Sequence, residues 1–393
     1  MSEQQIVIWG AGRIGRGFVA DLFDAAGYRL TLVDQSRELI AALRAAGRYT
    51  VVCAEGAGRR RDRLIAGYAA LATDQVEEVA GAIAGADLLA LAVFPQNFTQ
   101  VAQQLAHGLR RRWRESPGRA LDIILCTNLT HAAAQFGVAL QAALPDDLRA
   151  AAADHVGIVE SLVIRTVVEP PAHESQREPL LVWTNGYGEL PVDRTAFRGA
   201  LPQVAGLRLI DNMPAQEVRK LYTYNMCHAV LAYLGALRGH ELAIECLADP
   251  EIRPVAEGAL AEVSRALQAE YGFAADEMAR WNAEVIARTD NPSLGDRVTR
   301  QAADPQRKLR RTDRLTGPAL LAYRHGITPD CLAQAIAAAL RYRDPADPGA
   351  CHVQARVAEV GLRAAIIELC ELQPDEAGLA ALVLAADSRL AAA

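Results

Sequence analysis

The sequence contains very little lysine. Only Lys220 and Lys308 are lysines among its 41 lysine and arginine residues. Both side chains carry a positive charge, but a lysine can lose its proton when its surroundings lower its pKa, whereas an arginine stays protonated in proteins. A position that keeps lysine in this chain is therefore a candidate for proton transfer, although a chain can also keep a lysine or two by chance.

The sequence also lacks paired cysteines, an excess of positive charge and long apolar runs. Its seven cysteines are scattered without a C-x-x-C pair, which argues against a disulfide framework or a cysteine zinc site and favours a reducing compartment. The net charge of −6 argues against nucleic acid as the main partner. The apolar run at 88–94 is too short to cross a bilayer, and no signal-like leader precedes the first apolar run. We therefore expect a cytoplasmic protein with no metal, membrane or nucleic-acid partner.

Two short arginine-rich runs, at 59–63 and 110–114, stand out against this acidic background. Charge runs of this kind are usually solvated faces at loops or helix ends. We expect that role for both runs.

At 393 residues, the chain is long enough for two domains. In the first half, apolar runs alternate with helix-like segments, which predicts a doubly wound parallel sheet of the α/β class. From residue 194 onward, alanine- and leucine-rich helical periodicity takes over. We expect a Rossmann-type domain at 1–193 and a mostly α-helical domain at 194–393. The expected strands are 5–9, 30–33, 87–93 and 121–126, and the expected helices 96–111 and 130–144.

A glycine turn joins the first predicted strand to the first helix, in the string WGAGRIGRGF. In such a turn the first glycine permits the bend, the second lets the backbone approach a pyrophosphate, and the third brings helix and strand together. Asp34 follows the next apolar run, 19 residues after Gly15, where a carboxylate bonds the ribose hydroxyls. This carboxylate would repel a 2′-phosphate, so NAD is favoured over NADP, although Arg37 keeps NADP open. The cofactor-binding residues expected here are Gly10, Gly12, Arg13, Ile14, Gly15 and Asp34.

Ligands of doubly wound sheets lie beyond the carboxyl ends of the strands. Phe94 and Pro95 follow one predicted strand and Asn128 follows another, which places them beside the cofactor. Asn128 also suits the N-cap of the predicted helix at 130–144, so both interpretations stay open.

Three side chains of chemical interest lie on one predicted helix, within VRKLYTYNMCH. At about 100° per residue, Lys220, Asn225 and His228 stand at roughly 0°, 140° and 80°, so all three can face one cleft. A lysine that takes a proton from an alcohol must be neutral, which requires a pKa about three units below its usual value near 10.4. The pattern favours metal-free hydride transfer, with Lys220 as the base and amide donors from Asn128 and Asn225 on the reacting oxygen. His228 either bonds a neighbouring hydroxyl or is a satisfied histidine at a helix interface.

A basic segment occupies 291–314. Arg300 and Lys308 are its candidates for holding an anionic or polyhydroxylated substrate. A solvated basic loop is the alternative interpretation. The other cations considered close by are Arg297, Arg307, Arg310 and Arg311.

Taken together, these residues resemble the polyol-specific long-chain dehydrogenase/reductase family, and within it the mannitol-1-phosphate 5-dehydrogenases most closely. The resemblance implies a Rossmann domain, a helical carboxyl-terminal domain and a zinc-free active site between them. It also implies that Lys220 is the general acid/base, that Asn128 and Asn225 surround the reacting oxygen, and that Glu217 matches an acid near the proton path in some relatives. The resemblance further implies that His228, Arg300 and Lys308 bind the substrate. The strings that carry it are WGAGRIGRGF, LCTNLT, HVGIVESLVIR, RKLYTYNMCHAVLAYLGALRGHE, EYGFAADE, DNPSLGDRV and RKLRRTDRL.

Three residues near the expected site depart from that family's pattern. Ile164 stands where relatives have aspartate, Phe94 where the mannitol-phosphate enzymes tend to have glycine, and Thr127 where they carry glutamate. The resemblance therefore supports the type of reaction better than the substrate.

We expect an NAD-dependent dehydrogenase that interconverts a sugar alcohol, phosphorylated in the leading interpretation, and its ketose. Mannitol 1-phosphate and fructose 6-phosphate are the first pair to try. The alternatives are a reductase of a hexuronate, a free polyol or a hydroxyacid, and an inactive NAD-binding sensor, which the loss of aspartate at Ile164 motivates. We expect a monomer or a weak homo-oligomer.

Overall fold

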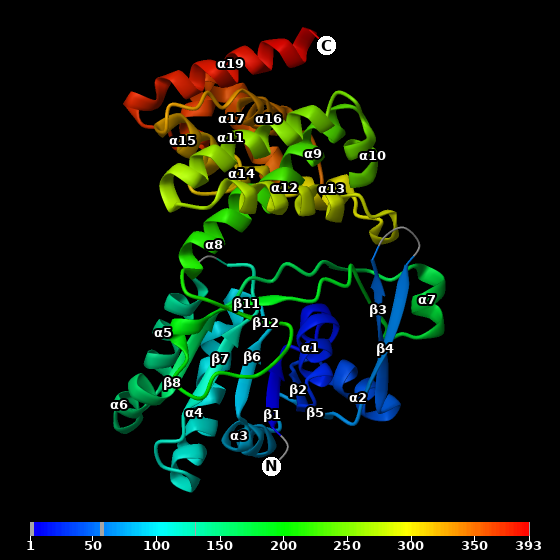
Figure 1. The fold of residues 1–393 in the computed structure, drawn as a ribbon, viewed down its shortest axis with the longest axis vertical. Coiled ribbons are helices and arrows are strands. Elements are labelled where there is room, and N and C mark those ends of the chain that lie inside the picture. The colour runs from blue at the N-terminus through cyan, green and yellow to red at the C-terminus, as the bar shows by residue number, and fades with distance from the viewer. Residues whose placement is uncertain (1–3, 56–58, 130, 393) are drawn as a thin grey trace. The chain divides into compact units, whose positions relative to one another are not determined.

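The computed structural model describes residues 4–55, 59–129 and 131–392 (Figure 1). The chain forms two compact units, Met1–Pro214 and Ala215–Ala393. The first unit extends beyond residue 193, where helical periodicity in the sequence had suggested its end. It does so because β12 (Leu207–Ile210) pairs in parallel with β11 (Leu190–Asp193).

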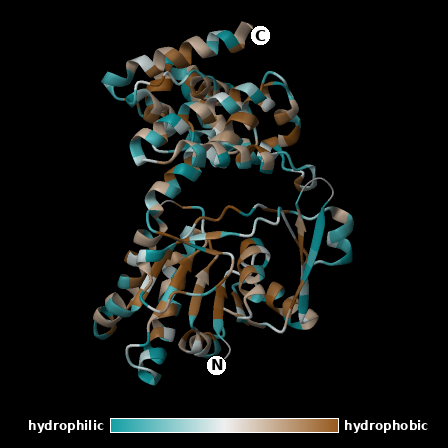
Figure 2. Ribbon diagram, viewed as in Figure 1, coloured by the Kyte–Doolittle hydropathy of each residue, from teal (hydrophilic) through white to brown (hydrophobic). Residues whose placement is uncertain are grey.

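A six-stranded parallel sheet forms the centre of the first unit, in the order β5-β2-β1-β6-β7-β8. This order confirms the doubly wound Rossmann-type class. The strands are mostly hydrophobic (Figure 2), as buried parallel strands are. Their bounds are Gln5–Trp9 (β1), Arg29–Asp34 (β2), Ala69–Ala72 (β5), Leu88–Leu91 (β6), Leu121–Leu125 (β7) and Val156–Glu160 (β8).

Helices cover both faces of this sheet because alternate strand residues point to opposite sides. Ile6 and Ile8 pack with the π-helical turn η1 (Gly15–Ala20), α1 (Asp21–Ala25) and α2 (Arg37–Ala46). Val7 and Trp9 pack with the helices of the other face. Those helices are α3 (Val76–Gly85), α4 (Phe98–Glu115), α5 (Ala132–Ala143) and α6 (Asp146–His155).

The structure contains a second sheet, in the order β4-β3-β10-β9, which the sequence did not predict. Its strand β4 (Arg60–Ala66) contains the first arginine-rich run, so the loop or helix end expected there is wrong. Arg63 binds the Asp21 carboxylate at 2.7 Å, and Arg60 pairs with Asp62, which explains how a strand tolerates this run. The other strands are β3 (Arg48–Ala54), β9 (Val167–Val168) and β10 (Val182–Thr184), and α7 spans Ala172–Arg177.

The second arginine-rich run lies in the last turns of α4, at a helix end as expected, but it is only partly solvated. Arg112 is buried, and its Nη1 donates to the carbonyl oxygens of Ala84 at 2.9 Å and Ala86 at 2.7 Å. These carbonyls lie at the end of α3, where helix carbonyls lack partners within the helix. Arg112 is therefore a structural residue, which its sequence context did not indicate.

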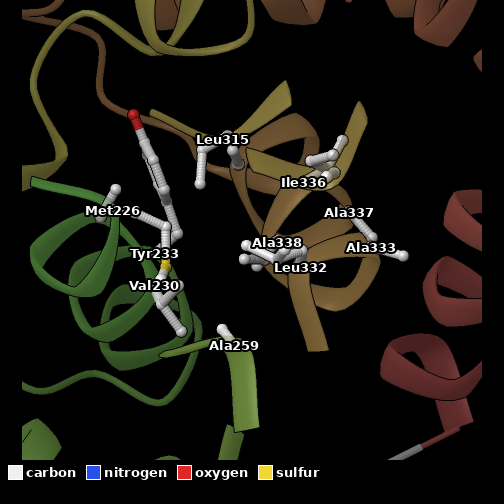
Figure 3. Packing of buried hydrophobic residues seen from close by; sticks show 14 of the residues in the cluster. Met226, Val230, Tyr233, Ala259, Leu315, Leu332, Ala333, Ile336, Ala337 and Ala338 are labelled. Atoms are coloured by element: carbon white, nitrogen blue, oxygen red, sulfur yellow. The ribbon is translucent and has the colours of Figure 1, made fainter. Parts of the chain in front are cut away.

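The second unit is helical, as expected, and has its own hydrophobic core. Met226, Val230 and Tyr233 of α9 and Leu332 of α16 belong to one cluster of buried residues (Figure 3). None of the helices in the described parts of the chain combines the length and apolar character needed to cross a bilayer. The helices are α8 (Met213–Lys220), the π-helical turn η4 (Leu221–Asn225), α9 (Met226–Leu237), α10 (Ala243–Ala248), α11 (Arg253–Tyr271), α12 (Ala275–Thr289), α13 (Val298–Ala302), α14 (Pro305–Lys308), α15 (Thr316–Arg324), α16 (Asp330–Arg341), α17 (Pro348–Val360), α18 (Leu362–Leu369) and α19 (Ala377–Ala392).

Candidate functional site

The glycine turn after β1 has the geometry of a dinucleotide-binding turn. Gly10 has φ of 96°, and a Cβ at this residue would lie 2.3 Å from the carbonyl oxygen of Ala92. A Cβ at Gly15 would lie 1.9 Å from the carbonyl oxygen of Gly10, so the helix approaches β1 as closely as its backbone allows. A Cβ at Gly12 would meet no atom of the described chain within 4 Å. The protein itself therefore requires Gly10 and Gly15, whereas the open face at Gly12 suits the close approach of a pyrophosphate.

Arg13 and Ile14 begin the helix after this turn. The Arg13 guanidinium pairs with Glu169, and both side chains are exposed. Ile14 packs against the hydrophobic cluster of the sheet. Arg13 thus places an exposed guanidinium at the start of this helix, whereas Ile14 contributes packing rather than a polar side chain.

Asp34 ends β2 at the same edge of the sheet. Its Oδ1 accepts a hydrogen bond from the Ser36 backbone N–H at 2.9 Å, and its Oδ2 has no partner among the described residues. The nearby Arg37 pairs with Asp74. A free carboxylate oxygen beside an arginine that is already paired suits ribose hydroxyls better than a 2′-phosphate.

Removing the Asp34 carboxylate tests this assignment. In Asp34→Ala, we expect NADH affinity to fall by about 10- to 100-fold, the usual loss of hydrogen bonds to a charged group, and the preference over NADPH to narrow. Fluorescence titration of both reduced cofactors measures this. Glu38→Ala, which removes an exposed carboxylate in the first turn of α2, is the matched control and should keep both affinities. An unchanged NADH/NADPH ratio in Asp34→Ala would show that this acid does not contact the ribose.

Phe94 and Asn128 follow β6 and β7, at the same edge as the glycine turn. Phe94 is 71 % exposed, which is unusual for a large aromatic side chain and suits a contact with a ligand. Asn128 is exposed and lies before the residue that holds the N-cap position of the following helix. Helix α5 has His131 as its N-cap residue, with φ of 57°, and Glu160 accepts a hydrogen bond from the Ala133 N–H at 2.7 Å.

Lys220, Asn225 and His228 lie along one helical path in the second unit, as expected, but the helix is not regular. Lys220 ends α8, Asn225 ends the π-helical turn η4, and His228 lies in α9. A π-helical turn widens the helix and changes the angular spacing that a regular helix would give, and such turns are frequent at functional sites. Asn225 and His228 are half-buried, and Lys220 is only 6 % exposed.

The surroundings of Lys220 favour its neutral form. Burial and, to a smaller extent, the Arg314 guanidinium lower the pKa of the Lys220 amine from its ordinary 10.5 to about 8, against the opposing effect of Glu217. The preceding residue differs sharply, because the buried Arg219 lies 4.2 Å from the Trp281 ring centroid and pairs with Glu277. Arginine thus serves in a structural ion pair at 219, whereas lysine stands at 220, where a proton can be lost.

His228 belongs to the same charged cluster. Burial lowers the pKa of His228, Asp296 opposes this shift, and Arg300 and Lys220 add to it. Its ring lies 4.5 Å from that of Tyr224, between centroids. A neutral imidazole in this position can donate one hydrogen bond and accept another, which suits a hydroxyl group.

The two expected substrate-binding cations both have partners within the protein. Arg300 is 59 % exposed and binds Asp296, with Nε at 2.7 Å from Oδ1. Lys308 is 3 % exposed and donates from Nζ to the carbonyl oxygens of Gln301, at 2.8 Å, and Ala303. Burial, followed by the Arg314 charge, lowers the pKa of Lys308 to about 7. Both lysines of the chain are thus buried in the second unit with lowered pKa values.

Sequence reasoning missed two members of this cluster, Asp296 and Arg314. Both lie in strings that carried the family resemblance, DNPSLGDRV and RKLRRTDRL, but their charges had no assigned role. Among the described residues, no group of three or more histidine, cysteine or acidic side chains could hold a metal ion.

Two family models cover most of the chain. Residues 4–206 match the mannitol dehydrogenase Rossmann domain, and residues 212–366 match the mannitol dehydrogenase C-terminal domain. The fold is similar to that of Pseudomonas fluorescens mannitol 2-dehydrogenase in a ternary complex with NAD and D-mannitol, with a TM-score of 0.79, 17 % identity and coverage of 99 % of this chain and 92 % of that one. It is also similar to D-sorbitol dehydrogenase in a substrate-free form, with a TM-score of 0.85, 17 % identity and coverage of 99 % and 93 %.

Proposed function

The chain belongs to the mannitol dehydrogenase family, and on that basis we propose that it is an NAD-dependent dehydrogenase that interconverts a sugar alcohol and its ketose. The observation that carries the proposal is the buried Lys220 amine, whose pKa is lowered to about 8. At pH 7 an amine of pKa about 8 is neutral in about one molecule in ten, against about one in 3,000 for an ordinary lysine. Burial thus supplies the base that oxidation of an alcohol requires.

In the proposed reaction, Lys220 accepts the hydroxyl proton as the carbon–oxygen bond becomes a carbonyl. NAD, bound at the glycine turn and Asp34, supplies the acceptor for the hydride that leaves the same carbon. Asn128 and Asn225 donate amide hydrogen bonds to the oxygen while it carries negative charge, which lowers the barrier most in a site shielded from water. In the reverse direction, the Lys220 ammonium returns the proton to the oxygen.

The remaining site residues are proposed to orient the substrate. His228 bonds a hydroxyl next to the reacting carbon, and Arg300 and Lys308 bind further oxygen atoms. Because Asp296 holds Arg300 through two hydrogen bonds, the guanidinium is fixed before substrate binds. Fixing donors in advance reduces the entropy cost of positioning a flexible polyol.

The lowered pKa of Lys220 predicts a specific pH dependence. A protonated amine cannot accept a proton, so kcat/KM for alcohol oxidation should rise about tenfold per pH unit below pH 8 and level off above it. Ketose reduction needs the ammonium form, so its kcat/KM should be level below about pH 8 and fall above it. Initial rates in both directions from pH 6 to 10 measure this. A rise in oxidation that continues to pH 10 would mean that the base has the pKa of an ordinary lysine.

For the substrate, we propose a phosphorylated polyol, with mannitol 1-phosphate and fructose 6-phosphate as the first pair to test. A free polyol is the second candidate, because the two similar structures are those of a mannitol and a sorbitol dehydrogenase. A panel of polyol phosphates, free polyols, hexuronates and hydroxyacids, each with NAD and NADP, separates these candidates. Turnover of hydroxyacids alone would refute the polyol proposal, and saturable NADH binding without turnover would favour an NAD-binding sensor.

A further inference from the structure

Arg314 occupies a rigid turn between α14 and α15. The Leu315 backbone N–H donates to the Lys308 carbonyl at 3.3 Å, and the Thr316 hydroxyl donates to the Leu309 carbonyl at 2.6 Å, which closes the turn. The Arg314 backbone N–H and side-chain Nε both bind Asp313 Oδ1, at 2.6 Å and 2.8 Å. The position of the guanidinium is therefore set by the protein before any ligand arrives.

The far end of this guanidinium has no hydrogen-bond partner in the part of the chain that the structure describes. The side chain of Arg314 is 17 % exposed, and within the described residues its Nη1 and Nη2 make no hydrogen bond. Asp313, its one acidic partner, also accepts a hydrogen bond from Arg307 at 3.3 Å, so its charge is shared between two arginines. Two fixed N–H donors on a mostly buried arginine form a fork that matches two oxygen atoms of one anion.

Other cations of the 291–314 segment are engaged or point elsewhere. Arg300 is bound by Asp296, Lys308 by two carbonyl oxygens, and Arg311 by both oxygens of Glu376 at 2.6 Å. Arg310 has no described side-chain partner, but it lies exposed on the surface. Arg314 is thus a mostly buried cation of this segment, and its two Nη atoms have no hydrogen-bond partner among the described residues.

Arg314 also lies within electrostatic reach of the residues assigned to catalysis. Its charge lowers the pKa of Lys220, of His228 and of Lys308. The turn that holds Arg314 also contacts Lys308 directly, because the Leu315 N–H donates to the Lys308 carbonyl. An anion bound to the guanidinium would therefore lie close to a residue proposed to bind the substrate. A dianion bound there would be attracted by several positive groups at once, whereas an uncharged polyol would gain only hydrogen bonds.

We propose that Arg314 is a specificity residue that binds an anionic group of the substrate, a phosphate ester, through Nη1 and Nη2. This inference rests on the proposed function and deepens it, because it assigns the substrate class to one side chain. The phosphate lies at the Arg314 turn while a hydroxyl of the same substrate reaches Lys220.

Binding measurements with and without Arg314 test the inference. By calorimetric titration, we expect Arg314→Gln to weaken mannitol 1-phosphate binding by about 10- to 100-fold, because it removes hydrogen bonds to a charged group, and to change mannitol binding by less than about threefold. Arg314→Lys keeps the positive charge but loses the paired Nη donors. Its affinity for mannitol 1-phosphate should lie between those of the wild type and Arg314→Gln. Arg310→Gln, in the exposed cation of the same turn, is the matched control and should bind both ligands as the wild type does.

Kinetics distinguish this inference from the proposed function. In Arg314→Gln, the ratio of kcat/KM for mannitol 1-phosphate to kcat/KM for mannitol should also fall by about 10- to 100-fold. A change in the pKa of Lys220 would alter both values equally and cancel in this ratio, because the same base serves both substrates. Turnover of free mannitol with no advantage for the phosphate in the wild type, or equal loss of both ligands in Arg314→Gln, would overturn the inference but keep the proposed function. Phosphate-ester binding that depends on Arg314, without turnover of any polyol, would keep the inference and overturn the proposed function. NADH titration confirms that each variant is folded.

Discussion

Replacing Lys220 with arginine should reduce kcat by about 10²- to 10⁴-fold, the usual loss when a general base is removed. The substitution keeps a positive charge at the site, but the guanidinium cannot give up its proton at working pH. Arginine forms helices as readily as lysine, so the helical path through residue 220 should persist, and NADH binding should persist because the proposed cofactor residues lie in the first unit. Steady-state rates, NADH titration and thermal unfolding measure the three quantities.

A matched control separates the chemistry from the general cost of exchanging the two cations. Arg253→Lys makes the reverse exchange on the surface of the same unit, where Arg253 pairs with Glu257, and should leave kcat unchanged. Lys220→Met keeps the length of the side chain without an amine and should match Lys220→Arg in rate. Near-normal turnover in either Lys220 variant would remove this residue from the reaction.

A second large effect is expected at the glycine turn. In Gly15→Ala the new Cβ would lie 1.9 Å from the backbone oxygen of Gly10, so the turn must move. Because both partners are backbone-fixed, we expect a loss of about 3 kcal/mol or more in the stability of the first unit, at or above the usual cost of overpacking, together with loss of NADH binding. Scanning calorimetry and NADH titration measure both effects.

Gly12→Ala is the contrasting variant in the same turn. A Cβ at Gly12 meets no atom of the described chain within 4 Å, so stability should change by less than about 0.5 kcal/mol. NADH binding should nevertheless weaken by at least about tenfold, because the methyl group would occupy the space beside the pyrophosphate. Equal NADH affinity in Gly12→Ala and wild type would place the cofactor elsewhere.

The sequence predicted four strands of the main sheet, β1, β2, β6 and β7, because buried parallel strands leave apolar runs, but it did not predict β5 and β8. It did not predict the second sheet. The strand β4 consists largely of charged residues, and it is stable because ion pairs such as Arg63 to Asp21 form across distant parts of the chain. The sequence likewise predicted a solvated side chain for Arg112, which is buried because its carbonyl partners lie at the end of another helix. Local patterns carry no information about such long-range partners.

At the candidate site, too, the sequence could single out some residues and not others. Lys220 could be singled out because lysine is so rare in this chain, and its burial and lowered pKa agree with the chemistry inferred for it. Arg314 could not be singled out, because arginine is common here and each neighbour in RKLRRTDR looks alike in sequence. What distinguishes it is a turn that fixes its Nε on Asp313 and leaves its Nη atoms without a hydrogen bond to any described residue, which only the three-dimensional structure reveals. The π-helical turn before Asn225 was likewise invisible to an argument based on regular helix periodicity.

The scarcity of lysine makes one direct measurement of the base possible. If the protein is produced with lysine carrying carbon-13 at Cε, its NMR spectrum contains signals from only Lys220 and Lys308, and Lys308→Arg identifies which is which. Following the Lys220 signal from pH 6 to 11 gives the pKa of its amine. The account predicts a midpoint near pH 8. A midpoint near the ordinary 10.5 would contradict it, because that amine would hold its proton at the pH where the alcohol must lose one.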